Sequence, residues 1–206
     1  MNVLLINGSP RENGCTFTAL SEVAKSLNNS GVATEILHVG NENVRGCIAC
    51  GKCKQIQKCV FDDAVNEAAT RIPKIDGLVI GSPVYYASPN GGFLSFLDRL
   101  FYSTSSYDKR MMVGASIVSA RRGGCTSTFD VLNKYFTISG MPIASGSYWN
   151  MVHGSKPEDV AKDEEGLQIM RVLGQNMAFL IKSIALGKQE FGLPEKEPRK
   201  FTNFIR

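Results

Sequence analysis

The residues between positions 8 and 16 combine the chemical groups that bind a phosphate. Gly8 and Gly14 permit tight backbone turns, and the hydroxyls of Ser9 and Thr16 can donate hydrogen bonds. Arg11 adds a permanent positive charge, which pairs well with phosphate oxygens. A helix that follows would direct the free N–H groups of its first turn at the same anion. The segment therefore predicts a phosphate site between a strand and a helix.

The kind of phosphate ligand is narrowed by two motifs that the sequence lacks. It contains neither G-x-x-x-x-G-K-[ST], which binds the outer phosphates of a nucleotide, nor G-x-G-x-x-G, which binds a dinucleotide pyrophosphate. A loop that offers hydroxyls suits the terminal phosphate of a monoester, which accepts many hydrogen bonds. The alternative is an ordinary strand-to-helix turn in which Asn13 or Thr16 caps the helix.

A second chemical pattern comes from cysteine spacing. Four of the six cysteines follow C-x2-C-x2-C-x5-C, namely Cys47, Cys50, Cys53 and Cys59. Two short steps place three thiolates around a compact object and a short loop brings the fourth, as in cubane iron–sulfur sites. Zinc is the nearest inorganic alternative, although its structural sites more often use two separated C-x2-C pairs. The spacing predicts a [4Fe-4S] cluster, and free or oxidised thiols remain the other alternative.

The elements that must position these groups alternate along the chain. Apolar, β-branched segments predict strands at 3–7, 32–39, 76–83, 111–119 and 142–147. Helical periodicity predicts helices at about 17–30, 62–71, 93–101, 126–139 and 166–186. This alternation predicts an α/β fold with a parallel sheet wound on both faces. Ligands of such sheets bind at the carboxyl ends of strands, so the loops after the first, third and fourth strands should meet.

Those other two loops suit a flat, anionic ring. The loop 82–92 contains Tyr85 and Tyr86 between prolines that stiffen its backbone, and the loop 119–124 contains Arg121 and Arg122. A phosphate site, an aromatic slot and positive charge beside the slot together indicate flavin mononucleotide (FMN). The positive charge would stabilise the anionic reduced flavin. The alternative is that the two tyrosines only pack at the end of a strand.

Length and composition limit the remaining functional classes. The 206 residues are 43% hydrophobic, enough for one full core, and the net charge of +4 comes from scattered residues, which predicts no nucleic-acid partner. No apolar run reaches about 18 residues, so no membrane partner is expected. The first strand follows Met1 directly, which predicts a cytoplasmic protein without a signal peptide. In the cytoplasm its thiols are expected to stay reduced. We expect one domain over 1–187, with a cysteine-rich insertion at 44–60 and a C-terminal arm or tail at 188–206.

The phosphate loop and the third-strand loop together resemble a known family. Gly8-Ser9-Pro10-Arg11, with Gly14 and Thr16, and Gly81-Ser82-Pro83-Val84-Tyr85-Tyr86 are similar to the NADPH-dependent FMN reductase family over the chain to about Gly154. The resemblance implies a flavodoxin-like, doubly wound, five-stranded parallel sheet in a three-layer α/β/α arrangement. It implies homodimers or homotetramers. The cysteine motif is similar to that of the iron–sulfur flavoproteins, a branch of this family.

The resemblance also assigns roles to the three loops. It implies that the first loop holds the FMN phosphate, the second lines the isoalloxazine ring and the third closes over its pyrimidine side. Cys15 replaces the family's usual Asn or Ser, and a thiol is a weak donor. The predicted FMN contacts are Ser9, Arg11, Gly14, Cys15, Thr16, Ser82, Pro83, Val84, Tyr85, Tyr86, Ala87, Ser88, Ser119, Arg121, Arg122, Gly123 and Gly124.

Three functional hypotheses follow. The first is an FMN-dependent NAD(P)H oxidoreductase that passes electrons to a small-molecule or protein acceptor; no catalytic side chain is required, because the cofactor carries the chemistry. The second is an iron–sulfur flavoprotein that carries electrons between ferredoxin-like partners without oxidising NAD(P)H. The third is a cysteine-based redox or metal sensor with a structural flavin. The segment 148–154, which contains His153, is expected near the flavin edge at an interface.

Overall fold

The computed structural model describes residues 1–198, 200–202 and 204. The other four positions of the predicted C-terminal arm, 199, 203, 205 and 206, lie outside the described residues.

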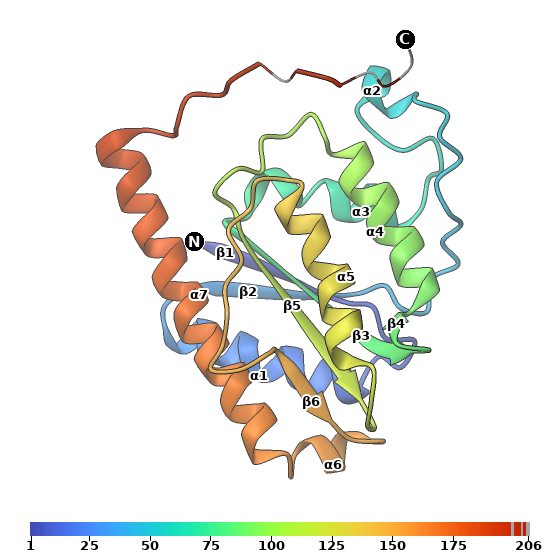
Figure 1. The fold of residues 1–206 in the computed structure, drawn as a ribbon, viewed down its shortest axis with the longest axis vertical. Helices are drawn as coiled ribbons and strands as arrows, with labels where there is room; N and C mark the ends of the chain where they lie inside the picture. The colour runs from blue at the N-terminus through green and yellow to red at the C-terminus, as the bar shows by residue number, and fades with distance from the viewer. Residues whose placement is uncertain (199, 203, 205–206) are drawn as a thin grey trace.

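Five parallel strands form the central sheet, in the order β2-β1-β3-β5-β6 (Figure 1). They are β1 (Asn2–Asn7), β2 (Ala33–His38), β3 (Gly77–Tyr85), β5 (Val113–Ala120) and β6 (Met151–His153). The two-residue strand β4 (Ser88–Pro89) pairs antiparallel with the end of β3. The winding direction changes between β1 and β3, which makes the carboxyl ends of these strands the expected place for a ligand.

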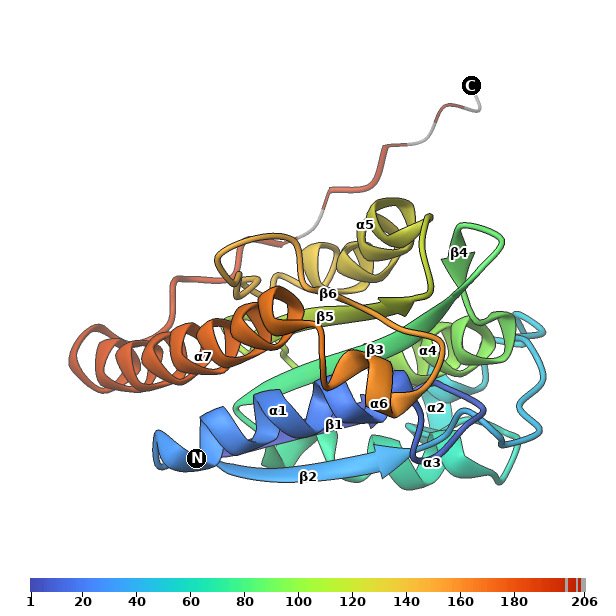
Figure 2. The same cartoon turned by 90° about the horizontal axis from the view of Figure 1, so that it is seen from below.

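The helices cover both faces of the sheet (Figure 2). They are α1 (Cys15–Asn29), α2 (Cys53–Ile56), α3 (Ala64–Ala69), the 3-10 helix η1 (Ile72–Lys74), α4 (Gly91–Ser103), α5 (Cys125–Thr137), α6 (Pro157–Val160) and α7 (Glu164–Phe191). Alternate residues of β1 face opposite layers: Val3 and Leu5 pack with α1 and α7, whereas Leu4 and Ile6 pack with α3, α4 and α5. The predicted three-layer α/β/α fold is therefore confirmed.

The fifth strand lies later in the chain than predicted. Residues 142–147 contribute only one isolated bridge, between Ile143 and Gly114, and the strand itself is β6. The reason is Asn150, which is buried: its side chain accepts a hydrogen bond from the N–H of Gly146 at 3.2 Å and donates one to the carbonyl of Ser116 at 3.1 Å. This side chain bridges a bend in the chain, so that pairing with β5 resumes only at Met151.

The last helix is longer than predicted. It continues to Phe191 instead of ending near residue 186, and Gly192 follows it with a φ of 73°. By length and composition alone α7 could cross a membrane, since an 18-residue window has a mean hydropathy of 1.3. One face of α7 is buried and packs against α1. Beyond it, Arg110 donates a hydrogen bond to the carbonyl of Pro194 at 2.9 Å.

Candidate functional site

The loop after β1 is held by close contacts with the neighbouring strand end and helix. Gly8 donates a backbone hydrogen bond to the carbonyl of Gly81 at 2.8 Å, and Asn90 donates one to the carbonyl of Gly8 at 3.0 Å. A Cβ atom at position 8 would lie 2.2 Å from Cγ of the buried Phe93, so only glycine fits there. His38 also holds this loop, with 2.8 Å between its Nε2 and the carbonyl oxygen of Ser9.

The start of α1 faces the same loop and offers hydrogen-bond donors to an anion. Its N-cap is Gly14, which has no side chain to accept hydrogen bonds from the N–H groups of the first turn. Thr16 lies in that turn, and its hydroxyl is 2.8 Å from the hydroxyl of Ser119 at the end of β5. The hydrogen bond between these two hydroxyls joins the first and third predicted loops.

The three loops surround a cavity of about 290 Å³ at the carboxyl ends of the strands. The residues that line it are Ser9, Pro10, Arg11, Cys15, Thr16, Pro83, Val84, Tyr85, Ser119, Ala120, Arg121, Gly154 and Ser155. Predicted contacts from all three loops are therefore brought together. Gly154 belongs to the segment expected near the flavin edge, but Ser155 is not among the predicted contacts, because the fifth strand was placed too early.

Other predicted contacts lie outside the lining of this cavity. They are Gly14, Ser82, Tyr86, Ala87, Ser88, Arg122, Gly123 and Gly124. Tyr86 and Ala87 have φ values of 51° and 56°, and the Tyr86 side chain points fully into solvent. Ser82 is buried and accepts a hydrogen bond from the N–H of Asn90 at 3.0 Å. These residues shape the loops around the cavity.

The charged side chains that line this cavity are basic. None of the described residues that line it is acidic, whereas Arg11 and Arg121 are both exposed there. Burial raises the pKa of the Cys15 thiol, so this group remains protonated at neutral pH. Its Sγ lies 3.5 Å from the carbonyl oxygen of Gly154, to which it donates. The arrangement suits a ligand with an anionic group and a flat body.

The four motif cysteines line a second, smaller pocket. Cys47 and Cys50 are exposed on a segment that forms neither helix nor strand, and Cys53 and Cys59 are half-buried. Burial, followed by the neighbouring thiols, raises the pKa of Cys53. The space enclosed is about 20 Å³. Within the described part of the chain, no three His, Cys, Asp or Glu side chains are close enough to hold a single metal ion.

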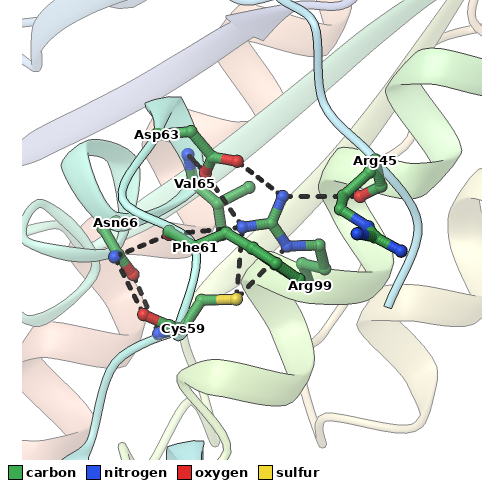
Figure 3. A network of polar contacts seen from close by, with 7 residues as sticks. All are labelled: Arg45, Cys59, Phe61, Asp63, Val65, Asn66 and Arg99. Atoms are coloured by element: carbon green, nitrogen blue, oxygen red, sulfur yellow. Dashed lines mark hydrogen bonds and ion pairs between the residues drawn. The ribbon is translucent and has the colours of Figure 1, made fainter. Parts of the chain in front are cut away.

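Cys59 is the best anchored of these four cysteines (Figure 3). Its N–H donates to the side chain of Asn66 at 2.9 Å, and Asn66 donates back to its carbonyl at 3.0 Å. Its Sγ accepts two hydrogen bonds from the guanidinium of Arg99, which projects from α4, at 3.3 and 3.1 Å. Sequence reasoning missed Arg99; the available signal was a charged residue among the apolar residues of a core helix.

The chain is similar to known flavoproteins over most of its length. The family model described as NADPH-dependent FMN reductase matches residues 1–156. An iron-sulfur flavoprotein of Methanocaldococcus jannaschii is 29% identical over 191 residues, which cover 89% of this chain and 99% of that protein.

Solved structures show the same fold at low sequence identity. The NAD(P)H:quinone oxidoreductase from Methanothermobacter marburgensis aligns with a TM-score of 0.65 at 18% identity, over 86% of this chain and 96% of that one. A flavodoxin from the domain Archaea aligns with a TM-score of 0.59 at 15% identity, over 88% of this chain and 99% of that one. The fold is therefore flavodoxin-like, as predicted.

Proposed function

Because the chain belongs to the NADPH-dependent FMN reductase family, we propose that it binds FMN and passes electrons from NAD(P)H to a second acceptor. The observation that carries this proposal is the cavity at the switch point of the sheet. Its lining combines the hydroxyl residues Ser9, Thr16 and Ser119 with Pro83, Val84 and Tyr85, and the first turn of α1 has no side-chain cap. FMN, when bound, supplies the hydride and single-electron chemistry.

The residues of the chain fit this cofactor. Ser9, Thr16 and the first turn of α1 bind the phosphate, and Arg11 balances its charge. Pro83, Val84 and Tyr85 provide an apolar wall that excludes water from one side of the ring. Arg121 places positive charge beside the cavity, which favours an electron-rich ring. Cys15 stays a thiol and contributes a weak donor.

We also propose that Cys47, Cys50, Cys53 and Cys59 hold a [4Fe-4S] cluster. Two observations support it: all four thiols line one pocket, and similar proteins are named iron-sulfur flavoproteins. The spacing C-x2-C-x2-C-x5-C is of the kind that iron–sulfur clusters use, whereas structural zinc sites more often use two separated C-x2-C pairs. Since the pocket encloses only about 20 Å³, the irregular segment with Cys47 and Cys50 must move outward to admit a cluster.

The second candidate function is electron carriage between ferredoxin-like partners without NAD(P)H oxidation. The cysteine pocket favours it, because a cluster exchanges single electrons. For either function we propose a cytoplasmic homodimer or homotetramer. Tyr148 and Trp149 are about half exposed and lie just before β6, whereas the cavity residues Gly154 and Ser155 follow this strand. Phe93 and Phe96 belong to the core and are not part of such an interface.

One experiment separates these functions. The protein is purified without oxygen, and its flavin, iron and acid-labile sulfide are measured before NADPH, NADH or a reduced ferredoxin is added. Flavin that bleaches with either nicotinamide supports the reductase. Flavin that responds only to ferredoxin, together with about four irons and four sulfides per chain, supports the carrier. Failure to bind added FMN would contradict both.

A further inference from the structure

Arg99 is an unusual residue for its place in the fold. It lies on α4, and its side chain is only 1% exposed. An arginine side chain keeps its positive charge even when it is buried. A buried charge is tolerated only where partners compensate for lost hydration.

Arg99 donates hydrogen bonds to Asp63, to the sulfur of Cys59 and, at 3.4 Å each, to the carbonyls of Arg45 and Phe61 (Figure 3). Asp63 accepts two hydrogen bonds, at 2.7 Å from Nη1 and at 2.9 Å from Nη2, which neutralise the charge. Nε and Nη2 are aimed at the sulfur of Cys59. A thiol sulfur is a weak acceptor, so it compensates poorly for the hydration that these buried N–H donors have lost. A sulfur that carries negative charge, as in a metal-bound thiolate, is a strong acceptor.

This geometry makes Cys59 a ligand that is positioned in advance. Asn66 on α3 fixes its backbone, and Arg99 on α4 fixes its sulfur. Asp63 fixes Arg99 in turn, and the same carboxylate accepts a hydrogen bond from the N–H of Val65 at 3.1 Å as the N-cap of α3. Two helices of the core therefore hold one ligand, whereas Cys47 and Cys50 lie on the exposed segment.

We propose that Arg99 is a positioning residue that orients Cys59 toward the cluster and raises the cluster's reduction potential; this inference rests on the [4Fe-4S] cluster proposed above. Reduction adds one electron, supplied by a donor of the flavin or ferredoxin class, and no proton has to be exchanged. Hydrogen bonds to cluster sulfurs and nearby positive charge both stabilise the added negative charge. Arg99 provides two hydrogen bonds at the sulfur of Cys59, while Asp63 balances its charge.

The chain offers a matched control for the effect of charge alone. The guanidinium of Arg45 lies over the ring of Phe61 at 4.9 Å from its centroid, and that of Arg99 lies over the same ring at 5.0 Å. Arg45 is exposed, and among the described contacts its side chain makes no hydrogen bond to Cys59. Removing Arg45 therefore deletes a similar charge near the pocket and leaves the sulfur contacts in place.

The test measures the cluster's midpoint potential by an EPR-monitored redox titration of the FMN-loaded protein after anaerobic reconstitution with iron and sulfide. The variants are Arg99→Lys, the double variant Arg99→Met with Asp63→Asn, and Arg45→Met. The double variant removes both partners of the ion pair, and asparagine keeps a good N-cap. We expect its reduced-to-oxidised ratio to fall roughly tenfold at a fixed potential, a shift of about 59 mV for one electron.

The other outcomes are equally decisive. Arg99→Lys keeps the charge and loses the planar two-donor contact, so an intermediate shift is expected, while Arg45→Met and the flavin potential stay unchanged. Loaded Arg99 variants with the wild-type potential, or an equal shift in Arg45→Met, would overturn the inference and leave the cluster standing. Loss of the cluster from both Arg99 variants would show a purely structural role and overturn it too. Wild-type protein that binds FMN but no iron and sulfide would overturn the cluster and this inference together.

Discussion

The cavity at the ends of the strands and the cysteine pocket are built in different ways. The cavity lies among regular elements, and its loops are joined by backbone contacts such as that between Gly8 and Gly81. Its volume is about 290 Å³. The cysteine pocket is bordered by an irregular segment, encloses about 20 Å³ and is anchored to the core mainly through Arg99 and Asn66.

This difference has a chemical reason. Binding FMN through many weak contacts requires a surface formed before the ligand arrives, since each contact contributes little. Four thiolate–iron bonds can instead supply the free energy that orders a loop. The first site should therefore respond to substitutions that alter its packing, and the second to loss of its one buried ion pair.

The largest effect is expected for Asp63→Ala. It leaves the buried guanidinium of Arg99 without its carboxylate and removes the N-cap of α3, which should lower the free energy of unfolding by about 3–4 kcal/mol. Chemical denaturation of the apoprotein measures this. The neighbouring, exposed Asp62→Ala is the control and should change stability by less than about 0.5 kcal/mol. Equal losses in the two variants would show that the ion pair does not anchor this region.

A smaller loss of stability is expected for Gly8→Ala. The new methyl group would overlap the ring of the buried Phe93, at a cost of about 2 kcal/mol, and the displaced loop should bind FMN more weakly. Thermal unfolding and flavin-fluorescence titration measure the two effects. Gly123→Ala is the control, because a methyl group there has nothing within 4 Å. FMN affinity that survives Gly8→Ala unchanged would refute the preformed loop.

Thr16→Val tests one hydroxyl of the proposed phosphate site. Losing the hydroxyl that contacts Ser119 and faces the cavity should weaken FMN binding about tenfold, or about 1.4 kcal/mol. Thr18→Val removes a hydroxyl from the same helix that instead donates to the carbonyl of Gly14, so it should leave FMN affinity nearly unchanged. A comparable loss in both would mean that the effect comes from the helix and not from phosphate contact.

The smallest expected effect is a difference in FMN affinity between variants of two adjacent tyrosines. Tyr85 lines the cavity and Tyr86 points into solvent, so Tyr85→Ala should weaken FMN binding by about 1 kcal/mol, whereas Tyr86→Ala should stay within about 0.5 kcal/mol of wild type. Equilibrium titration of both apoproteins with FMN measures the difference. The reverse order would place the flavin ring outside the described cavity.

Features that depend on neighbouring residues could be predicted from the sequence. Apolar runs such as Val3 to Ile6 predict a buried strand, because successive side chains of a strand point to opposite faces and here both faces are apolar. The chemistry of the loops at Ser9, Tyr85 and Arg121, and the spacing of the four cysteines, are likewise local. The parallel arrangement then follows because alternating strands and helices allow few topologies. These features were sufficient to predict the fold and the edge of the sheet where the cavity lies.

Contacts between residues that are distant in the sequence became apparent only in the folded structure. The bend at Asn150 moved the fifth strand because a side chain bonded to both Gly146 and Ser116. The left-handed conformations of Tyr86 and Ala87 turned one of two adjacent tyrosines away from the cavity. Arg99 contacts Cys59, which lies 40 positions away in the sequence. A buried charge needs compensating partners, and the packing of α3 and α4 brings this one within hydrogen-bond distance. No local pattern specifies such a partner, because the contact exists only once the core has formed.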